Sequence, residues 1–180
     1  MGPFKFAVAR KAEATVYGAQ CPGYPAQAVD ATPVSEWISF MQQNGVRQVC
    51  CLLPSKQLAY DRLDLLGTYR EVFGESNVCH AAIEDDRLCA PATLEDNILP
   101  FLLQSDQART AVVVHGSAGS GRTGHVLAAW IALHLGQSGD NALAAVASTG
   151  RDPWQAVWYG KATKLLLRGL LAGPSSRRAD

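Results

Sequence analysis

An α/β fold, with helices on both faces of a central sheet, is predicted by three features of this chain. The runs Val49–Leu53 and Val112–Val114 are apolar without alternation and predict buried strands, and the first of them suits a sheet that is covered on both faces. Segments with apolar residues at helical spacing separate these runs. The second run leads into a glycine-rich segment, residues 116–124, and then into His125–Leu135, which is apolar almost all round and predicts a buried helix.

The boundaries of the other elements follow from local signals. Thr32 before Pro33 predicts the start of the first helix, and Gly45 predicts its end. Thr93, with Asp96 three residues later, predicts a second helix start through a pattern similar to a capping box. The predicted strands are 15–18, 49–53, 78–83 and 112–115, and the predicted helices are 33–43, 58–73, one that starts at 93, 125–135, 141–148 and 153–171.

The length and composition fit one globular domain. The 180 residues suffice for a single core, and we expect a loose leader over 1–14, the domain over 15–172 and a flexible tail over 173–180. The 16 basic and 16 acidic residues cancel, which argues against nucleic acid or an acidic membrane as a partner. No apolar run is long enough to cross a bilayer and no secretion signal is recognised, so a cytoplasmic protein is expected.

The cysteines do not indicate a metal site or a disulfide framework. There are five, an odd number, and none has paired C-x-x-C spacing. Cys50 and Cys51 lie in an apolar run and are expected to pack in the core. We expect no metal and no cofactor.

The strand, glycine-rich turn and helix start over residues 112–124 form the pattern of an anion-binding site. Unpaired N–H groups at a helix start point into such a turn, and the helix dipole favours negative charge there. Arg122 adds a planar set of donors that fits a phosphate at two points. A tight turn with a surface arginine is the alternative, but packing alone does not explain so many glycines beside one arginine.

Two motifs fit this loop. The nucleotide P-loop, G-x-x-x-x-G-K-[ST], is matched by Gly116, Gly121 and Thr123, whereas Arg122 replaces the lysine. An arginine fork differs in shape from the compact charge of lysine. The second motif is H-C-x-x-G-x-x-R-[ST], or in its longer form H-C-x-A-G-x-G-R-T-G. His115, Gly119, Arg122 and Thr123 match it, and Gly116 stands where the motif has cysteine.

The second motif is the signature of cysteine-dependent protein-tyrosine and dual-specificity phosphatases, which the chain resembles over about residues 16–171. A P-loop nucleotide fold places its loop after an early strand, with further βα units beyond it, whereas only helices are predicted after this loop. The short chain is similar to the compact, dual-specificity-like branch. The resemblance implies a single three-layer domain with a mixed, mostly parallel sheet, and a phosphate-binding loop between the last strand and a buried helix.

The resemblance also implies roles for the loop residues. In the family a cysteine thiolate attacks phosphorus, and Gly116 occupies that position. Arg122 matches the arginine that binds the phosphate oxygens, Thr123 the hydroxyl that assists departure of the thiolate, and His115 the histidine that holds the loop. His115 is equally well explained as a structural residue. The phosphate is expected to meet the backbone N–H groups of the loop residues Ser117, Ala118, Gly119, Ser120, Gly121 and Arg122.

A general acid is also required, because the leaving oxygen must be protonated. The family uses an aspartate on a loop that precedes the phosphate-binding loop, here called the cradle (residues 116–124). The Ile-Glu-Asp pattern of small members maps this role onto Asp85. Asp86 is the next candidate, and a solvated acidic turn is the alternative explanation. Gln155 is a weaker candidate for the residue that positions the attacking water, and it fits an exposed helix position as well.

Glycine at position 116 leaves the chain without the family's nucleophile, so we expect an inactive protein that still binds phosphate. The intact acid, arginine and threonine favour an engineered inactive variant, and a natural pseudophosphatase that binds phosphorylated partners is the alternative. The expected ligands are a phosphorylated protein or a small phosphate ester, and inorganic phosphate or sulfate. The sequence does not indicate the oligomeric state.

Overall fold

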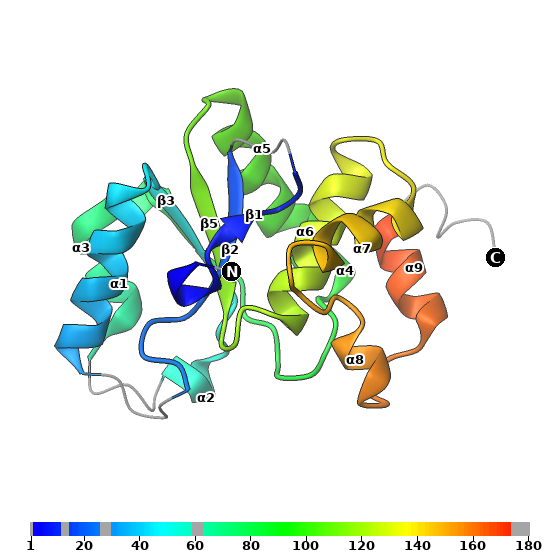
Figure 1. Ribbon diagram of the computed structural model, residues 1–180, viewed down its shortest axis with the longest axis horizontal. Coiled ribbons are helices and arrows are strands. Elements are labelled where there is room, and N and C mark those ends of the chain that lie inside the picture. The colour runs from blue at the N-terminus through cyan, green and yellow to red at the C-terminus, as the bar shows by residue number, and fades with distance from the viewer. Residues whose placement is uncertain (1, 12–14, 26–29, 59–62, 174–180) are drawn as a thin grey trace.

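A mixed sheet of five strands, in the order β1-β2-β5-β3-β4, forms the centre of the computed structural model (Figure 1). The structure describes residues 2–11, 15–25, 30–58 and 63–173. β1 pairs antiparallel with β2, and the other neighbouring strands are parallel. This confirms the predicted mixed, mostly parallel sheet. The strands are β1 (Ala7–Val8), β2 (Val16–Gln20), β3 (Gln48–Cys51), β4 (Val78–His80) and β5 (Val112–Gly116).

Helices cover both faces of this sheet. The α-helices are α1 (Ala31–Gln43), α2 (Ser55–Leu58), α3 (Leu65–Phe73), α4 (Pro91–Thr93), α5 (Leu99–Gln107), α6 (Gly121–Leu133), α7 (Gly139–Ala147), α8 (Gln155–Trp158) and α9 (Lys164–Ala172). A π-helical turn, Leu94–Ile98, joins α4 to α5, and short 3-10 turns lie at Pro3–Lys5 and Glu75–Asn77. Helices α1 and α3 lie on one face, and α4 to α7 and α9 lie on the other (Figure 1).

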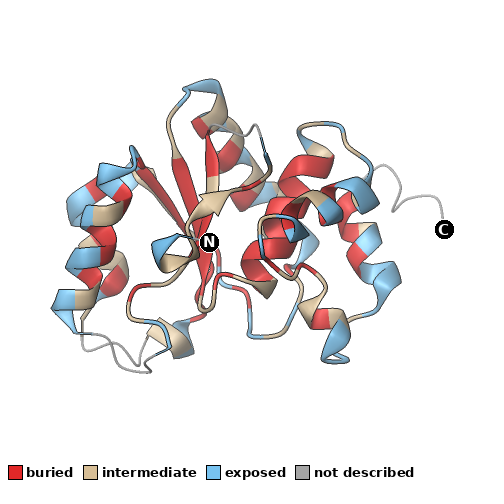
Figure 2. Cartoon of the chain, in the orientation of Figure 1, coloured by how far each residue is buried: buried red, intermediate tan, exposed pale blue. Residues whose placement is uncertain are grey.

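Each face of the sheet has its own apolar core. Val113 of β5 points to the α1 and α3 side, where it packs with Trp37 and Tyr69. Val112 and Val114 point to the other face and pack with residues of α6 such as Leu127. Both faces of β5 are therefore buried, which confirms the buried strand predicted over this run. Figure 2 shows the buried strands between two helical layers whose outer surfaces are exposed.

The N-terminal segment differs from the predicted loose leader. Within 1–14, residues 7 and 8 form β1, which extends the sheet beside β2. Phe6 stacks on Tyr17 of β2 with 4.8 Å between ring centroids. Arg151 donates from Nη2 to the carbonyl of Lys5, at 3.0 Å, and to that of Gly18. A two-residue strand at an edge has too little pattern to be recognised in sequence. Residues 1, 12–14 and 174–180, and so most of the predicted tail, lie outside the described residues.

Several helix boundaries also differ from prediction. Thr32 and Thr93 lie inside helices and cap neither, because α1 starts at Ala31 and α4 starts at Pro91. The predicted helix 58–73 is α2 and α3 as described, and residues 59–62 between them lie outside the described residues. The predicted helix 153–171 is divided into α8 and α9, because Thr163 accepts from the Leu166 N–H at 3.1 Å and so caps a new helix.

The parallel strands direct their carboxyl ends to one edge of the sheet, where ligands of open α/β folds usually bind. The segments that leave β2, β3, β4 and β5 all start there. In the described part of the chain no helix is long and apolar enough to cross a membrane.

Candidate active site

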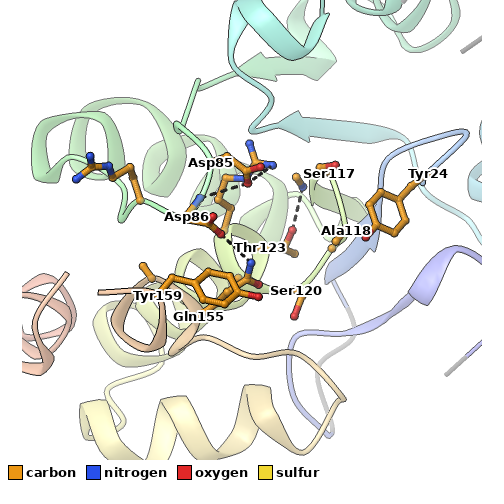
Figure 3. Close-up of a pocket in the computed structure, with 15 residues that line it drawn as sticks. Tyr24, Asp85, Asp86, Ser117, Ala118, Ser120, Thr123, Gln155 and Tyr159 are labelled. Carbon is orange, nitrogen blue, oxygen red and sulfur yellow. Dashed lines mark hydrogen bonds and ion pairs between the residues drawn. The ribbon is translucent and has the colours of Figure 1, made fainter. Parts of the chain in front are cut away.

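A cavity of about 260 Å³ opens at this edge of the sheet. Its walls come from the loops after β2, β4 and β5 and from α8 with the residue that follows it, so parts of the chain that are far apart in sequence meet here (Figure 3). The lining residues are Tyr24, Asp85, Asp86, Arg87, Gly116, Ser117, Ala118, Gly119, Ser120, Gly121, Arg122, Thr123, Gln155, Ala156 and Tyr159. The structure therefore brings together every site residue predicted from the sequence except His115.

The floor of the cavity is the loop between β5 and α6, as the sequence predicts. Ser120 precedes α6, and its carbonyl accepts the first helical hydrogen bond, from Gly124 N–H at 2.7 Å. The N–H groups at the start of α6, from Gly121 to Thr123, have no carbonyl one turn earlier in this helix. They and the dipole of the 13-residue helix favour an anion at the floor of the cavity.

Gly119 is the residue that the loop conformation requires to be glycine. Its φ is +66°, in the left-handed region that other residues rarely adopt, and an added Cβ would lie 2.5 Å from the backbone of Ala19. An added Cβ at Gly121 would lie 2.6 Å from Gln155, and one at Gly124 would lie 3.0 Å from Pro153. These three glycines are thus explained by the tight fit of the loop and the start of α6 against β2, the segment before α8 and the first residue of α8.

Gly116 is different, because neither its backbone nor its surroundings require glycine. Its φ lies outside the left-handed region. A Cβ placed on it would lie 3.4 Å from Arg122 Cβ and Nε and 3.6 Å from Thr123 Oγ1, which are ordinary contact distances. The Gly116 N–H donates to Thr123 Oγ1 at 2.9 Å. A larger side chain at position 116 would therefore fit, with the Thr123 hydroxyl and the Arg122 guanidinium beside it.

Arg122 is buried, with 6 % of its surface exposed. Its Nη1 donates to Gln57 Oε1 at 2.7 Å and to the Ile83 carbonyl at 3.1 Å. Its Nη2 forms an ion pair with Asp85 Oδ1 at 3.0 Å. Burial lowers the pKa of Arg122, but a guanidinium stays protonated in proteins. The cavity therefore holds a fixed positive charge next to position 116.

The two aspartates of the loop after β4 have different partners. Asp85 points toward Arg122 and retains 61 % of its side-chain surface exposed. Asp86 has a φ of +55°, and its Oδ1 accepts from Gln155 Nε2 at 3.0 Å. Gln155 thus contacts both Asp86 and the start of α6 (Figure 3). Both carboxylates line the cavity, so either is placed to donate a proton to a bound ester.

His115 lies behind the cavity, in the core on the α1 side of the sheet. Its ring packs against Trp37 and Tyr69, with ring centroids 5.3 and 5.6 Å away. Its Nδ1 donates to the Gly116 carbonyl at 3.2 Å. Burial lowers the pKa of His115 to about 4, so the ring is neutral at pH 7. It orients the backbone at position 116 and adds no charge to the cavity.

Four residues at the site carried no recognisable signal in the sequence. Gln57 contacts Arg122, and Tyr24, Arg87 and Tyr159 line the cavity. In the view of Figure 3, Tyr24 and Tyr159 lie on opposite sides of the loop. The two tyrosines come from segments without a motif, and only the sheet topology brings these segments together.

His125, on α6, connects the loop that carries the aspartates to the start of α6. Its Nε2 accepts from the Cys89 N–H at 3.0 Å, and its Nδ1 donates to the Gly121 carbonyl at 3.0 Å. Protonation of Nε2 would break the bond to Cys89, and burial lowers the pKa of His125 to about 4. The neutral ring therefore maintains the contact between the loop after β4 and α6.

We expect acid to destabilise the fold through these two histidines. Their folded pKa values of about 4 lie below the ordinary value of 6.5, so the unfolded chain binds more protons between these pH values. The contribution of each neutral ring to the free energy of unfolding is then fully present above about pH 6.5. It is lost as the pH drops toward 4, by roughly 3 kcal/mol per ring. Urea unfolding at pH 7 and pH 5 measures the first part of this loss, about 2 kcal/mol per ring. His125→Leu is expected to be less stable at pH 7 but to lose less between the two pH values, and an equal loss in both proteins would contradict the argument.

Comparison with known protein families identifies the chain. The family model described as Tc-R-P, polymorphic toxin system, DSP-PTPase phosphatase, matches residues 25–137. The chain belongs to this family of DSP-PTPase phosphatases. The match covers the three strands β3, β4 and β5, most of the segment between β2 and β3, the loop after β4 and the β5–α6 loop.

Solved phosphatase structures share the fold of this family member. Tk-PTP in its active form has a TM-score of 0.67 at 20% identity, over 94% of this chain and 99% of that chain. PTPMT1 in complex with PI(5)P has a TM-score of 0.68 at 15% identity, over 97% and 99%. TpbA of P. aeruginosa, in complex with pTyr, has a TM-score of 0.53 at 18% identity, over 90% and 88%. A comparison with curated protein sequences finds no match.

Proposed function

We propose that this DSP-PTPase family member binds phosphate groups at the β5–α6 loop and does not hydrolyse them. The observation that carries the proposal is position 116, where a complete cradle surrounds a residue without a side chain. Arg122, the helix start and the loop N–H groups supply the anion site, and none of the residues found to line the cavity is a cysteine whose thiolate could form a covalent bond with phosphorus. The ligand class is a phosphorylated protein or a small phosphate ester, with inorganic phosphate or sulfate as the simplest probes.

The neighbouring side chains fit the family's chemistry once a cysteine occupies position 116. Its thiolate would attack phosphorus and displace the ester oxygen, to which Asp85 would donate a proton. Arg122 would bind the equatorial oxygens as their charge grows. Water would then hydrolyse the phosphocysteine, with the Thr123 hydroxyl assisting departure of the thiolate. Asp86 and Gln155 would border the path of that water.

We infer that glycine 116 is an engineered substitution in an otherwise complete phosphatase, with a cytoplasmic location. The room for a Cβ at this position supports this origin. A natural pseudophosphatase that binds phosphorylated partners is the second candidate, since the exposed Asp85 and the cavity walls serve binding as well.

Calorimetric titration with sulfate, phosphate and vanadate in the absence of magnesium tests the proposed site. We expect all three anions to bind, and we expect Arg122→Lys to weaken binding by about tenfold or more, because lysine cannot form the two-point contact. Arg168→Lys is the matched control, since Arg168 pairs with Asp140 at the surface. Magnesium-dependent ATP binding far tighter than anion binding would instead favour a nucleotide-binding protein, and an unchanged affinity of Arg122→Lys would place the anion elsewhere.

A further inference from the structure

Gln57 of α2 links two side chains of the cavity that come from different loops. Its Oε1 accepts from Arg122 Nη1 at 2.7 Å, and its Nε2 donates to Asp85 Oδ2 at 3.4 Å. The ion pair between Arg122 Nη2 and Asp85 Oδ1, at 3.0 Å, closes a ring of three side chains. The loops after β3, β4 and β5 are thereby connected above the cradle.

The contact with Gln57 fixes the orientation of the Arg122 guanidinium. The two N–H groups of Nη1 meet Gln57 Oε1 and the Ile83 carbonyl, on the side away from the cradle. The opposite edge of the guanidinium carries Nε and Nη2: Nε lies 3.4 Å from the point where a Cβ of residue 116 would be, and Nη2 pairs with Asp85. Two parallel N–H groups on one edge are the geometry that binds two oxygens of a phosphate.

The second half of the Gln57 amide orients Asp85. Its N–H group donates to Asp85 Oδ2, which leaves Oδ1 facing Arg122. An amide provides both an acceptor and a donor, whereas a carboxylate in its place would offer acceptors only and would repel Asp85. A leucine of similar size would provide neither. The ring therefore depends on an amide at this position and on the length of the glutamine side chain.

We propose, on the basis of the function proposed above, that Gln57 is a positioning residue that presents the Nε–Nη2 edge of Arg122 to a bound phosphate and turns Asp85 toward that edge. Gln57 acts through these two side chains and does not itself meet the reacting atoms. Its effect is to set the direction of the two groups that the anion and the leaving oxygen would contact.

Sulfate titration of three variants tests the role of Gln57 in anion binding. Gln57→Leu is expected to weaken sulfate binding by about tenfold, the loss of one charge-assisted hydrogen bond that orients Arg122. Gln57→Glu is expected to weaken it as well, although it preserves the shape, because the added carboxylate competes with sulfate for Arg122. Gln43→Leu, an exposed glutamine on α1, is the matched control and should bind as the unmodified protein does.

A second measurement does not depend on anion binding. Nitrogen-15 NMR of the Arg122 side chain reports how fast its guanidinium protons exchange with solvent, and Gln57→Leu is expected to raise this rate by about tenfold because the Nη1 contact is lost. On the Gly116→Cys background the same variant should lower kcat as well as raise KM, since the side chains of Asp85 and Arg122 are no longer held in their orientation by Gln57. A residue that only fills space would leave the exchange rate unchanged.

The outcomes separate the inference from the proposed function. If the unmodified protein binds no sulfate, the proposed function is wrong, and the Arg122 exchange rate alone decides the role of Gln57. If sulfate binds but Gln57→Leu changes neither its affinity nor the exchange rate, the inference is wrong. Should Gln57→Leu fail to fold, Gln57→Asn, which is one methylene too short to span both contacts, is expected to give the same losses by the same two measurements.

Discussion

Replacement of Gly116 by cysteine is expected to convert this chain from an inactive protein into a phosphatase. The unmodified protein should release no p-nitrophenol from p-nitrophenyl phosphate, whereas Gly116→Cys should raise the rate by roughly 10³-fold or more, because loss of a covalent nucleophile can cost up to about 10⁶ in kcat. The new side chain has room, with ordinary contact distances to Arg122 and Thr123. Absorbance of p-nitrophenol measures the rate.

The new thiol should also be ionised at neutral pH. It would stand at the N-terminus of α6 beside a buried arginine, an environment that lowers a cysteine pKa from about 8.5 to as little as about 3.5–7.5. Two natural thiols behave in the opposite way, since burial raises the pKa of Cys51 and of Cys89 to about 12. Iodoacetamide at pH 6 should therefore label the new cysteine faster than either of these.

Two variants control for the nucleophile. Gly116→Ser fills the same space with a hydroxyl that is not ionised and should stay inactive. Cys21→Ser on the Gly116→Cys background should stay active, although the Cys21 N–H donates to the Ser117 carbonyl and so lies at the loop. Hydrolysis by the unmodified glycine protein would mean that water or another side chain attacks phosphorus. A folded but inactive Gly116→Cys protein would favour a binding protein whose loop lacks catalytic geometry.

The residues that the sequence could predict are those that act through a local pattern. The loop from position 116 to 124 was recognisable because strand, glycines, arginine and helix are contiguous, and the three β-branched residues Val112–Val114 correctly predicted a buried strand. Gln57 could not be predicted, because its role depends on the parallel pairing of β3 with β4 and β5, which places three loops side by side. Sequence separation conceals such contacts until the topology is known.

Polar residues that are typical of N-caps did not predict where the helices start. Thr32 and Thr93 have the composition of N-caps, yet neither caps a helix, since the helical turn begins before each of them. Thr163, which did not stand out in the sequence, caps α9. Local preference is a weak guide to where a helix starts, because tertiary context often overrides it. The roles of Asp85 and Asp86 differ for a similar reason, because adjacent residues in an acidic turn point to different partners.

On the Gly116→Cys background, we expect Asp85→Ala to lower kcat by about 10² to 10⁴, the usual effect of losing a general acid. Asp85 is exposed and directed at Arg122, which places its carboxyl beside the anion site, where the leaving oxygen would lie. The loss should be larger for phosphotyrosine than for p-nitrophenyl phosphate, because the nitrophenolate leaves with little need of a proton. Comparison of kcat for the two substrates measures this difference.

Asp86→Ala is the matched control, because it removes a carboxylate from the same loop that is held by Gln155 rather than by the anion-binding arginine. It should lower kcat much less and equally for both substrates. Asp85→Asn adds a second test, since the amide keeps the shape of the side chain and can still contact Arg122 but has no acidic proton to give. If Asp85→Asn retains full kcat on phosphotyrosine, Asp85 is a partner of Arg122 and not the acid. If Asp86→Ala causes the larger, substrate-dependent loss, the general acid is Asp86, and the ion pair of Asp85 with Arg122 serves to hold the arginine while the cavity is empty.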